Sequence, residues 1–297
     1  MNVAILMGGT STEREISIST GTAVAKACEQ LNYEVDSVML NDSIESVLPR
    51  LRNMDIVFNA LHGGEGENGD IQRCLDEENI VYTGSGPEAS YLCMNKHLSK
   101  GVVREAEFDT PDWYLINPSD DIPKNLIFPL VVKPNDQGST VGLSIVHNED
   151  ELIPAIDRAS VHSDKILLET FIPGREITVA IVGKDVFPIV EIVPSHELYD
   201  YECKYTTGMS RYECPAKIPE ALTNQIQNDA LRMYEALNCS GYGRVDFRLD
   251  DNGRYWFLEM NTLPGMTDTS LVPKAYQSGG GTFSELINKI ITEALNG

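Results

Sequence analysis

The chain has 297 residues, a length that accommodates about two domains, and its formal net charge at pH 7 is −22. A surface this acidic repels phosphate backbones and anionic lipid, which argues against nucleic acid or a membrane as a partner. Its six cysteines form no C-x-x-C pair, and the sequence contains neither a signal peptide nor an apolar run of about 20 residues, so we expect a cytoplasmic protein with reduced thiols.

Residues 1–94 predict alternating strands and helices. An apolar run at residues 3–7 ends in two glycines, as a buried parallel strand would, and a helix-period pattern follows at 16–31. The alternation continues with strands expected at 33–40, 55–61 and 80–83 and with helices expected at 44–51 and 71–78. Together these elements predict a doubly wound α/β domain.

The rest of the chain predicts two further regions. Residues 95–179 begin with a polar, basic helical stretch at 94–107 and contain expected strands at 128–133, 142–146 and 165–170 and a helix at 149–159. Residues 180–297 continue a strand at 176–182 and contain a strand at 186–193 and helices at 219–237 and 283–295. Residues 194–215 are polar, carry four tyrosines and have no periodicity, so we expect a lid loop there.

The strongest signal for chemistry is the segment GYGRVDFRLDDNGRYWFLEMNTLPG at residues 241–265. Two strand-like runs flank an Asn-Gly dipeptide at 252–253, which predicts a hairpin with a two-residue type I′ turn. Counting back from that turn places Asp246 opposite Glu259, and two residues further along it pairs Arg244 with Asn261 on the same face. Carboxylates opposed at about 5 Å repel each other, and a divalent cation would remove that repulsion. The hairpin therefore predicts a magnesium site, with an ordinary charged surface hairpin as the alternative.

No Walker sequence G-x-x-x-x-G-K-[ST] occurs, so any phosphate must be held in another way. The segment LVVKPNDQGSTVG at 130–142 predicts a strand that delivers Lys133 ahead of a Gly-Ser-Thr loop whose amides could cradle phosphate. In LLETFIPGREIT at 167–178, Glu169 and Glu176 bracket backbone that could hydrogen-bond an adenine edge. Taken alone, each segment also fits an ordinary strand end followed by a turn.

Candidate substrate-binding residues follow the first and third expected strands. In MGGTSTEREIS at 7–17, an acid at the start of a helix, Glu13 or Glu15, either stabilises the helix or binds a substrate ammonium. His62 opens the glycine-rich loop HGGEGENGD at an expected strand end, where ligands of α/β sheets gather. By contrast, TGSGPEA at 83–89 is an incomplete dinucleotide fingerprint without the ribose-binding acid, which argues against NAD.

The ordered motifs MGGTSTEREIS, ALHGGEGENGDIQ, YTGSG, KPNDQGSTVG, YDYECKY, GYGRVDF, LEMNTLPGMT and SLVP resemble the D-alanine–D-alanine ligase family of the ATP-grasp superfamily, over essentially the whole chain. The resemblance implies an N-terminal doubly wound α/β domain followed by central and C-terminal α+β domains that clamp ATP. It implies ATP-dependent ligation of two D-alanines through a D-alanyl phosphate, for peptidoglycan precursor synthesis. It also implies two magnesium or manganese ions per active site and favours a homodimer.

The resemblance also gives individual positions a role. The metal ligands it implies are Asp246, Glu259 and Asn261. The nucleotide-binding residues are Lys96 and Lys133 for the phosphates, Glu169, Phe171 and Ile172 for adenine, and Glu176 for ribose. The catalytic set is Glu13 for the ammonium of the first D-alanine, Ser139 and Tyr205 for closing the lid, and Arg244 and Gly265 for the oxyanion. The pocket for the second D-alanine is Lys204, Ser270 and Leu271, and His62 lies near the first.

Two positions bear on specificity. Thr170 stands beside the adenine-site acid where many relatives carry a lysine, so adenine contacts fall to the backbone. Tyr205 favours an amine over a hydroxyl nucleophile, because relatives that make a D-alanyl-D-lactate ester lack this tyrosine. Three alternatives remain at this point: an ATP-grasp ligase for other amino or hydroxy acids, a non-catalytic nucleotide-binding protein on the same fold, and a dehydrogenase.

Overall fold

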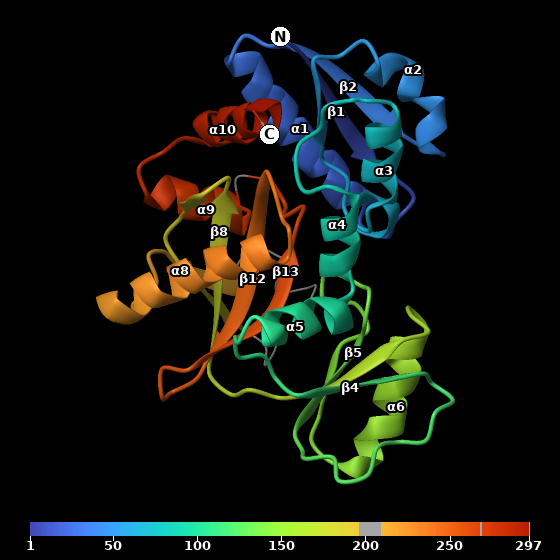
Figure 1. Ribbon diagram of the computed structural model, residues 1–297, viewed down its shortest axis with the longest axis vertical. Coiled ribbons are helices and arrows are strands. Elements are labelled where there is room, and N and C mark those ends of the chain that lie inside the picture. Colours follow the sequence, from blue (N-terminus) through green and yellow to red (C-terminus); the bar gives the residue numbers. More distant parts are fainter. Residues whose placement is uncertain (196–208, 268, 297) are drawn as a thin grey trace.

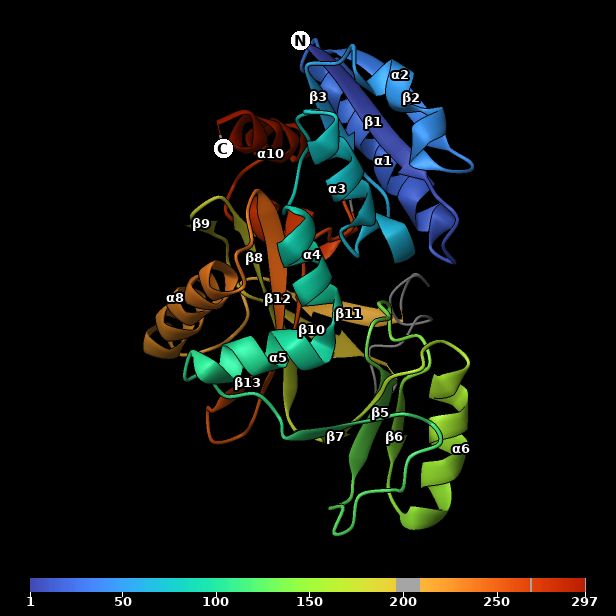
Figure 2. The same ribbon diagram turned by 45° about the vertical axis from the view of Figure 1, so that its right-hand side comes forward.

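The computed structural model describes residues 1–195, 209–267 and 269–296. Three β-sheets follow one another down the long axis of the molecule, from the N-terminal sheet at the top of Figure 1 to the sheet of β4–β7 at the bottom. The helices α4 (Pro87–Met94) and α5 (Lys96–Glu105) connect the upper and lower parts (Figure 2). Over the described ranges, no helix is both long and apolar enough to cross a membrane.

The N-terminal sheet is parallel, in the order β2-β1-β3, and helices cover both of its faces. Its elements are β1 (Asn2–Gly8), α1 (Arg14–Gln30), β2 (Glu34–Leu40), a 3-10 turn (Ile44–Ser46), α2 (Leu48–Leu51), β3 (Ile56–Asn59), a second 3-10 turn (Gly64–Gly66) and α3 (Asp70–Glu77). Val3 and Ile5 face α1, whereas Ala4 and Leu6 pack among residues of α2 and α3. The doubly wound domain is confirmed, and burial on both faces explains the unbroken apolar run of β1.

The last helix of the chain, α10 (Phe283–Asn296), returns to this first domain. Figure 1 shows it beside α1, and the Ser284 hydroxyl donates a hydrogen bond to Gln30 at 2.7 Å. The same helix buries Leu286 and Ile290 in a core shared with β1 and α1. Residues from both ends of the chain therefore stabilise one hydrophobic core.

The helical stretch expected at 94–107 is two helices, α4 (Pro87–Met94) and α5 (Lys96–Glu105). Asn95 separates them in an extended conformation, and its side chain accepts a hydrogen bond from the Leu98 amide at 3.0 Å. An asparagine that caps a new helix favours a break over a continuous helix. Both helices pack against the C-terminal sheet, and the break delivers Lys96, the first residue of α5, to the site described below.

The central sheet is antiparallel, in the order β4-β7-β5-β6, and α6 packs on it. Its elements are β4 (Trp113–Ile116), β5 (Leu130–Pro134), β6 (Ser144–Val146), α6 (Glu149–Ser160) and β7 (Ile166–Thr170). The sequence prediction missed β4, a four-residue edge strand without a long alternating pattern. It is stabilised by pairing with β7, a partner more than forty residues away.

The C-terminal sheet has six antiparallel strands, in the order β11-β10-β8-β12-β13 with β9 paired to β8. Its elements are β8 (Arg175–Val182), β9 (Asp185–Val186), β10 (Val190–Pro194), β11 (Ser210–Glu213), α8 (Glu220–Ala236), β12 (Tyr242–Leu249), β13 (Tyr255–Asn261) and α9 (Leu271–Ser278). Ile177 and Val179 of β8 pack toward α8, and Ala180 and Val182 pack toward α9 and α10. Burial on both faces makes this sheet the rigid support of the site.

Three details of the sequence prediction are wrong. The strand expected at 80–83 is a single bridge between Val57 and Tyr82. Part of the expected lid, 194–215, is the regular strand β11, which pairs with β10. The helix α9 was not predicted; its Pro273 lies in the first turn, where a missing backbone N–H breaks no helical hydrogen bond.

Candidate active site

Two cavities adjoin each other between the sheets. The larger has a volume of about 370 Å³ and lies between the first domain and the C-terminal sheet. The smaller, of about 110 Å³, lies between the central and C-terminal sheets. Lys96, Arg244 and Glu259 line both. A molecule in one cavity can therefore meet a molecule in the other at these three side chains.

The hairpin of β12 and β13 forms the floor at this junction. Asp246 lies opposite Glu259 and Arg244 opposite Asn261, as counted from the sequence. The turn itself differs from the prediction: Asp250 pairs with Arg254, so the loop has three residues and ends at Gly253 with a φ of +81°. This geometry belongs to a type I turn with a glycine bulge, not to a type I′ turn.

A β-bulge restores the expected register. Phe247 pairs with Phe257, one residue out of step with the Asp246 pair, so Leu258 of β13 is the extra residue. A bulge re-aims side chains and is common beside active sites. The two deviations from an ideal hairpin cancel, and Asp246 and Glu259 meet as predicted.

Basic side chains of the same site accompany both carboxylates. Arg244 makes a bidentate pair with Asp246, at 2.8 and 2.7 Å, and the Lys96 ammonium lies 3.2 Å from Glu259. The Thr178 hydroxyl on β8 also donates to Asp246, at 2.6 Å. Arg244 and Lys96 therefore balance the negative charges of the two carboxylates on this floor.

Glu13 lines the larger cavity. Glu13 precedes α1, is 9% exposed and accepts a hydrogen bond from the Ser139 hydroxyl. Ser139 comes from the loop between β5 and β6 and has a φ of +51°. The structure thus joins residues 126 positions apart, whereas Glu15 is exposed and lines neither cavity.

His62 lies on the wall of the larger cavity, buried among polar partners. Its Nε2 is 2.9 Å from the Thr20 hydroxyl and its Nδ1 is 3.3 Å from Glu67. Neither partner was predicted. Glu67 also lines the cavity, and no motif in the sequence distinguishes it from the other acids of its loop.

The C-terminal wall of the larger cavity contains Gly265, Ser270 and Leu271. The Ser270 hydroxyl accepts a hydrogen bond from the Thr267 amide at 3.0 Å, and a Cβ at Gly265 would lie only 3.1 Å from that hydroxyl. A side chain at 265 would therefore crowd the wall. Lys204 and Tyr205, which the family resemblance brings to the same pocket, lie outside the described residues.

The smaller cavity contains the predicted nucleotide-binding residues. Its lining includes Lys133, Glu169, Thr170, Phe171, Ile172 and Glu176. Arg248 also lines it and donates hydrogen bonds to the carbonyl groups of Ile172 and Gly174 at 3.1 and 2.8 Å. Thr170 has no charge to offer a ligand, so the backbone after it remains the polar edge of this wall.

Glu169 is 2% exposed and is shared by two lysines. Lys133 donates to it at 2.8 Å and Lys100 at 2.5 Å. Burial by itself would raise the pKa of Glu169, but the two lysines outweigh it and hold the pKa below its ordinary value. Lys100 was not predicted from the sequence, because one lysine in a basic amphipathic helix carries no signal of burial.

Comparisons with known proteins identify relatives of the chain. A family model described as "D-ala D-ala ligase C-terminus" matches residues 102–292. The D-alanine–D-alanine ligases of Syntrophotalea carbinolica and Aquifex aeolicus are 42% and 41% identical to this chain; each match covers 98% of it, and 95% and 100% of the relative.

Solved structures match the whole fold. A D-alanine–D-alanine ligase from Bacillus anthracis complexed with ATP superposes with a TM-score of 0.89 at 33% identity, covering 100% of this chain and 98% of that one. The VanG D-Ala:D-Ser ligase from Enterococcus faecalis superposes with a TM-score of 0.85 at 27% identity, and the match covers 99% of each chain. Full-length similarity in sequence and in structure shows that the chain belongs to the D-alanine–D-alanine ligase family.

Proposed function

We propose that this chain joins two D-alanines to D-alanyl-D-alanine at the expense of ATP. The observation that carries the proposal is the meeting of the two cavities at Lys96, Arg244 and Glu259. ATP in the smaller cavity can present its γ-phosphate there to a carboxylate in the larger one. The family membership of the chain supports the same reaction.

The first step is activation of a carboxylate. The carboxylate of the first D-alanine attacks the γ-phosphorus, the bond to ADP breaks, and a D-alanyl phosphate forms. A carboxylate is a poor electrophile, and phosphorylation supplies a leaving group. In the second step the amine of the second D-alanine attacks the carbonyl carbon and phosphate departs.

Residues of the smaller cavity bind the nucleotide in this proposal. Lys96 and Lys133 neutralise phosphate oxygens, since phosphoryl transfer depends mainly on positioning and charge stabilisation. The backbone at Phe171 and Ile172 hydrogen-bonds adenine, and Glu176 holds the ribose. The carboxylate of Glu169 already accepts from two lysines, so it acts on the phosphates through Lys133.

The donor set of the hairpin fits magnesium or manganese. Asp246, Glu259 and Asn261 offer carboxylate and amide oxygens from one face, and Arg244 and Lys96 now lie against the two acids. We infer that these three residues hold two ions. When bound, the ions supply charge neutralisation for the polyphosphate.

Residues of the larger cavity bind the amino acids. Glu13 binds the first ammonium and is fixed by Ser139, with His62 nearby. Lys204, Ser270 and Leu271 hold the second D-alanine, and Tyr205 ties the lid over the site to exclude water. Arg244 and the amide of Gly265 stabilise the oxyanion that develops on the carbonyl oxygen.

We place this reaction in the cytoplasm, where it serves peptidoglycan precursor synthesis, and expect the chain to act as a homodimer. The acidic composition is consistent with this location. The five cysteines within the described ranges form no disulfide, as expected in a reducing compartment.

The decisive assay combines ADP release with chromatography of the product, using ATP, magnesium and D-alanine. We expect D-alanyl-D-alanine with the D-isomer and none with L-alanine or without metal. D-Serine and D-lactate, each added together with D-alanine, test a different second substrate. ADP release that yields no dipeptide would overturn D-alanine as the nucleophile, and no ADP release would overturn the ligase reaction itself.

Replacing Glu13 by Gln is expected to raise the KM for the first D-alanine about 100-fold, because the ammonium loses a buried, charge-assisted partner. The KM for ATP should change less than about twofold, since Glu13 does not line the smaller cavity. Initial rates at varied D-alanine and at varied ATP separate the two constants. The matched control is Glu15→Gln, an exposed acid in the same helical turn; equal effects of both substitutions would contradict the assignment.

A further inference from the structure

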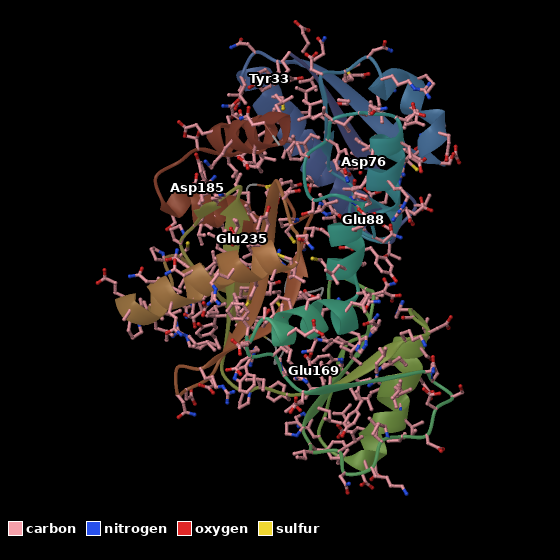
Figure 3. The ribbon with its side chains drawn as sticks, viewed as in Figure 1. Tyr33, Asp76, Glu88, Glu169, Asp185 and Glu235 are labelled. Carbon is pink, nitrogen blue, oxygen red and sulfur yellow. The ribbon has the colours of Figure 1, made fainter. Side chains whose placement is uncertain are left out.

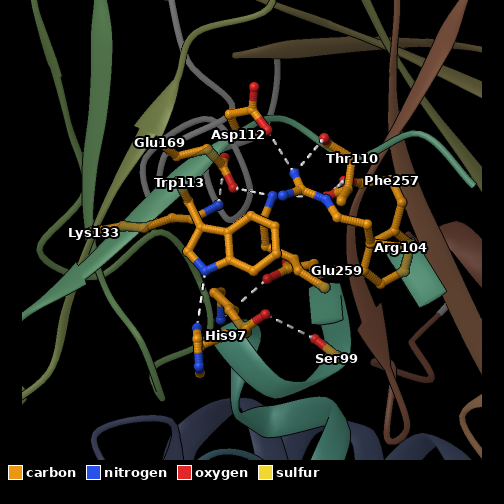
Figure 4. A network of polar contacts seen from close by, with 12 residues as sticks. His97, Ser99, Arg104, Thr110, Asp112, Trp113, Lys133, Glu169, Phe257 and Glu259 are labelled. Atoms are coloured by element: carbon orange, nitrogen blue, oxygen red, sulfur yellow. Dashed lines mark hydrogen bonds and ion pairs between the residues drawn. The ribbon is translucent and has the colours of Figure 1, made fainter. Parts of the chain in front are cut away.

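Lys100 is the most deeply buried charged side chain beside the smaller cavity. It extends from α5, and its side chain is 0% exposed. Its ammonium donates to Glu169 at 2.5 Å and to the Thr110 hydroxyl at 2.7 Å, and it lies 4.9 Å from the centre of the Trp113 ring. Figure 3 shows Glu169 between α5 and the central sheet, and Figure 4 shows the network around it.

The two lysines on Glu169 differ in their access to a ligand. Lys133 lines the smaller cavity, and Lys100 does not. Two positive charges and one negative charge give this buried group a net charge of about +1 when all three are ionised. Positive charge in a site shielded from water attracts a polyphosphate more strongly than the same charge on the surface.

Binding of a nucleotide would change which cation neutralises the Glu169 carboxylate. When Lys133 turns toward a phosphate oxygen, it weakens its contact with Glu169. A buried carboxylate that loses its cation is strongly destabilised, so Lys133 could not leave if it were the only partner. Lys100 remains in contact with the carboxylate throughout, since Thr110 and Trp113 fix its ammonium from other sides.

We propose that Lys100 is a positioning residue for nucleotide binding: it is the permanent counter-ion of Glu169, and it thereby frees Lys133 for the phosphates of ATP. The inference rests on the proposed function only in taking ATP as the ligand of the smaller cavity. The alternative is a purely structural role, in which Lys100 holds α5 against the central sheet.

A charge-rescue experiment separates the two roles. Lys100→Met leaves Glu169 with Lys133 alone, and Lys100→Met combined with Glu169→Gln restores the original net charge. Lys100→Met keeps the ion pair between Lys133 and Glu169, whereas in the double variant the buried Lys133 faces a neutral amide instead of a carboxylate. Thermal melting checks that both variants fold. Affinity is measured by calorimetry with magnesium and an ATP analogue whose β- and γ-phosphates are bridged by an imido group.

We expect Lys100→Met to weaken binding of the analogue about tenfold and the double variant to recover most of that loss. A purely structural role predicts a further loss of affinity in the double variant, because the second substitution removes another contact and the losses add. The matched control is Arg104→Met, one helical turn further along α5. Arg104 also stacks on Trp113, at 4.3 Å, but it is 46% exposed and does not contact Glu169; its loss should change affinity less than about twofold.

A pH series provides a second readout. Burial lowers the pKa of Lys100 to about 8, against the opposing pull of Glu169, with Lys133 and Arg104 as the other charges nearby. The ammonium is therefore charged below about pH 8 and neutral above it. Affinity for the analogue should fall as the pH rises through 8 in the wild type, and this fall should be absent in Lys100→Met.

The outcomes distinguish this inference from the proposed function. Additive losses in the double variant, or an unchanged affinity in Lys100→Met, would overturn the role of Lys100. Rescue of analogue binding in a protein that forms no dipeptide would uphold the role of Lys100 and overturn the proposed reaction. If the wild type does not bind the analogue at all, both fail together.

Discussion

Replacing Asp246 by Asn together with Glu259 by Gln is expected to lower kcat with magnesium by at least about 1,000-fold. The two substitutions keep the shapes of the side chains and remove both negative charges from the floor of the site. Without those charges the proposed metal ions lose their anionic ligands, and the transferring phosphoryl group loses its neutralising charge. Dipeptide formation at saturating ATP and D-alanine measures the effect.

The control for this variant is Asp251→Asn, an exposed acid in the turn of the same hairpin. It removes a carboxylate from the hairpin and should leave kcat within about twofold, because the residue lines neither cavity. Thermal melting shows whether the double variant remains folded, since Arg244 and Lys96 each lose a carboxylate partner in it. Turnover that survives within a few-fold in the folded double variant would place the metal site elsewhere.

Replacing Arg244 by Met is expected to lower kcat by about 100- to 1,000-fold, because the tetrahedral oxyanion loses a charged donor. Arg244 lines both cavities, so its guanidinium is near the reacting groups of either step. The effect should appear in kcat more than in the KM for ATP, because the oxyanion develops only during the reaction. Initial rates at varied ATP and varied D-alanine give both constants.

Arg254→Met is the matched control, since Arg254 lies at the opposite end of the same hairpin, where it pairs with Asp109. It is 55% exposed and lines neither cavity. We expect kcat within about twofold of the wild type and at most a small loss of thermal stability. A larger effect of Arg254→Met than of Arg244→Met would refute the assignment of Arg244 to the oxyanion.

In the hairpin of β12 and β13, the pairing of Asp246 with Glu259 was predicted correctly although the turn was not. Alternation along β12 and β13 placed Arg244, Asp246, Glu259 and Asn261 on one face, and it does so in the structure. The turn was expected one residue shorter than it is, and the bulge at Leu258 was not expected. The Asn-Gly dipeptide alone does not distinguish the two turns, because both place a glycine at the position that needs a positive φ.

Lys100, unlike the hairpin residues, could not be predicted from any pattern in the sequence. Its surroundings in the sequence are those of a solvated helix, and nothing near it marks a buried charge. Glu169 and Thr110 reach it from β7 and from the segment after α5, at sequence separations of 69 and 10 residues. Such a network exists only once α5 packs against the central sheet. A buried lysine therefore cannot be found from periodicity, which reports only apolar faces.

The sequence by itself determined the alternating strands and helices of the first domain, the shared face of the hairpin and the order of the family motifs. These depend on local periodicity and on the spacing of residues along one strand or loop. Only the tertiary structure decided that Glu13 meets Ser139, that two cavities join at Lys96, Arg244 and Glu259, and that Glu169 is shared by two lysines. Each of these contacts joins elements far apart in the chain, and their geometry is set by the packing of three separate sheets rather than by any local propensity.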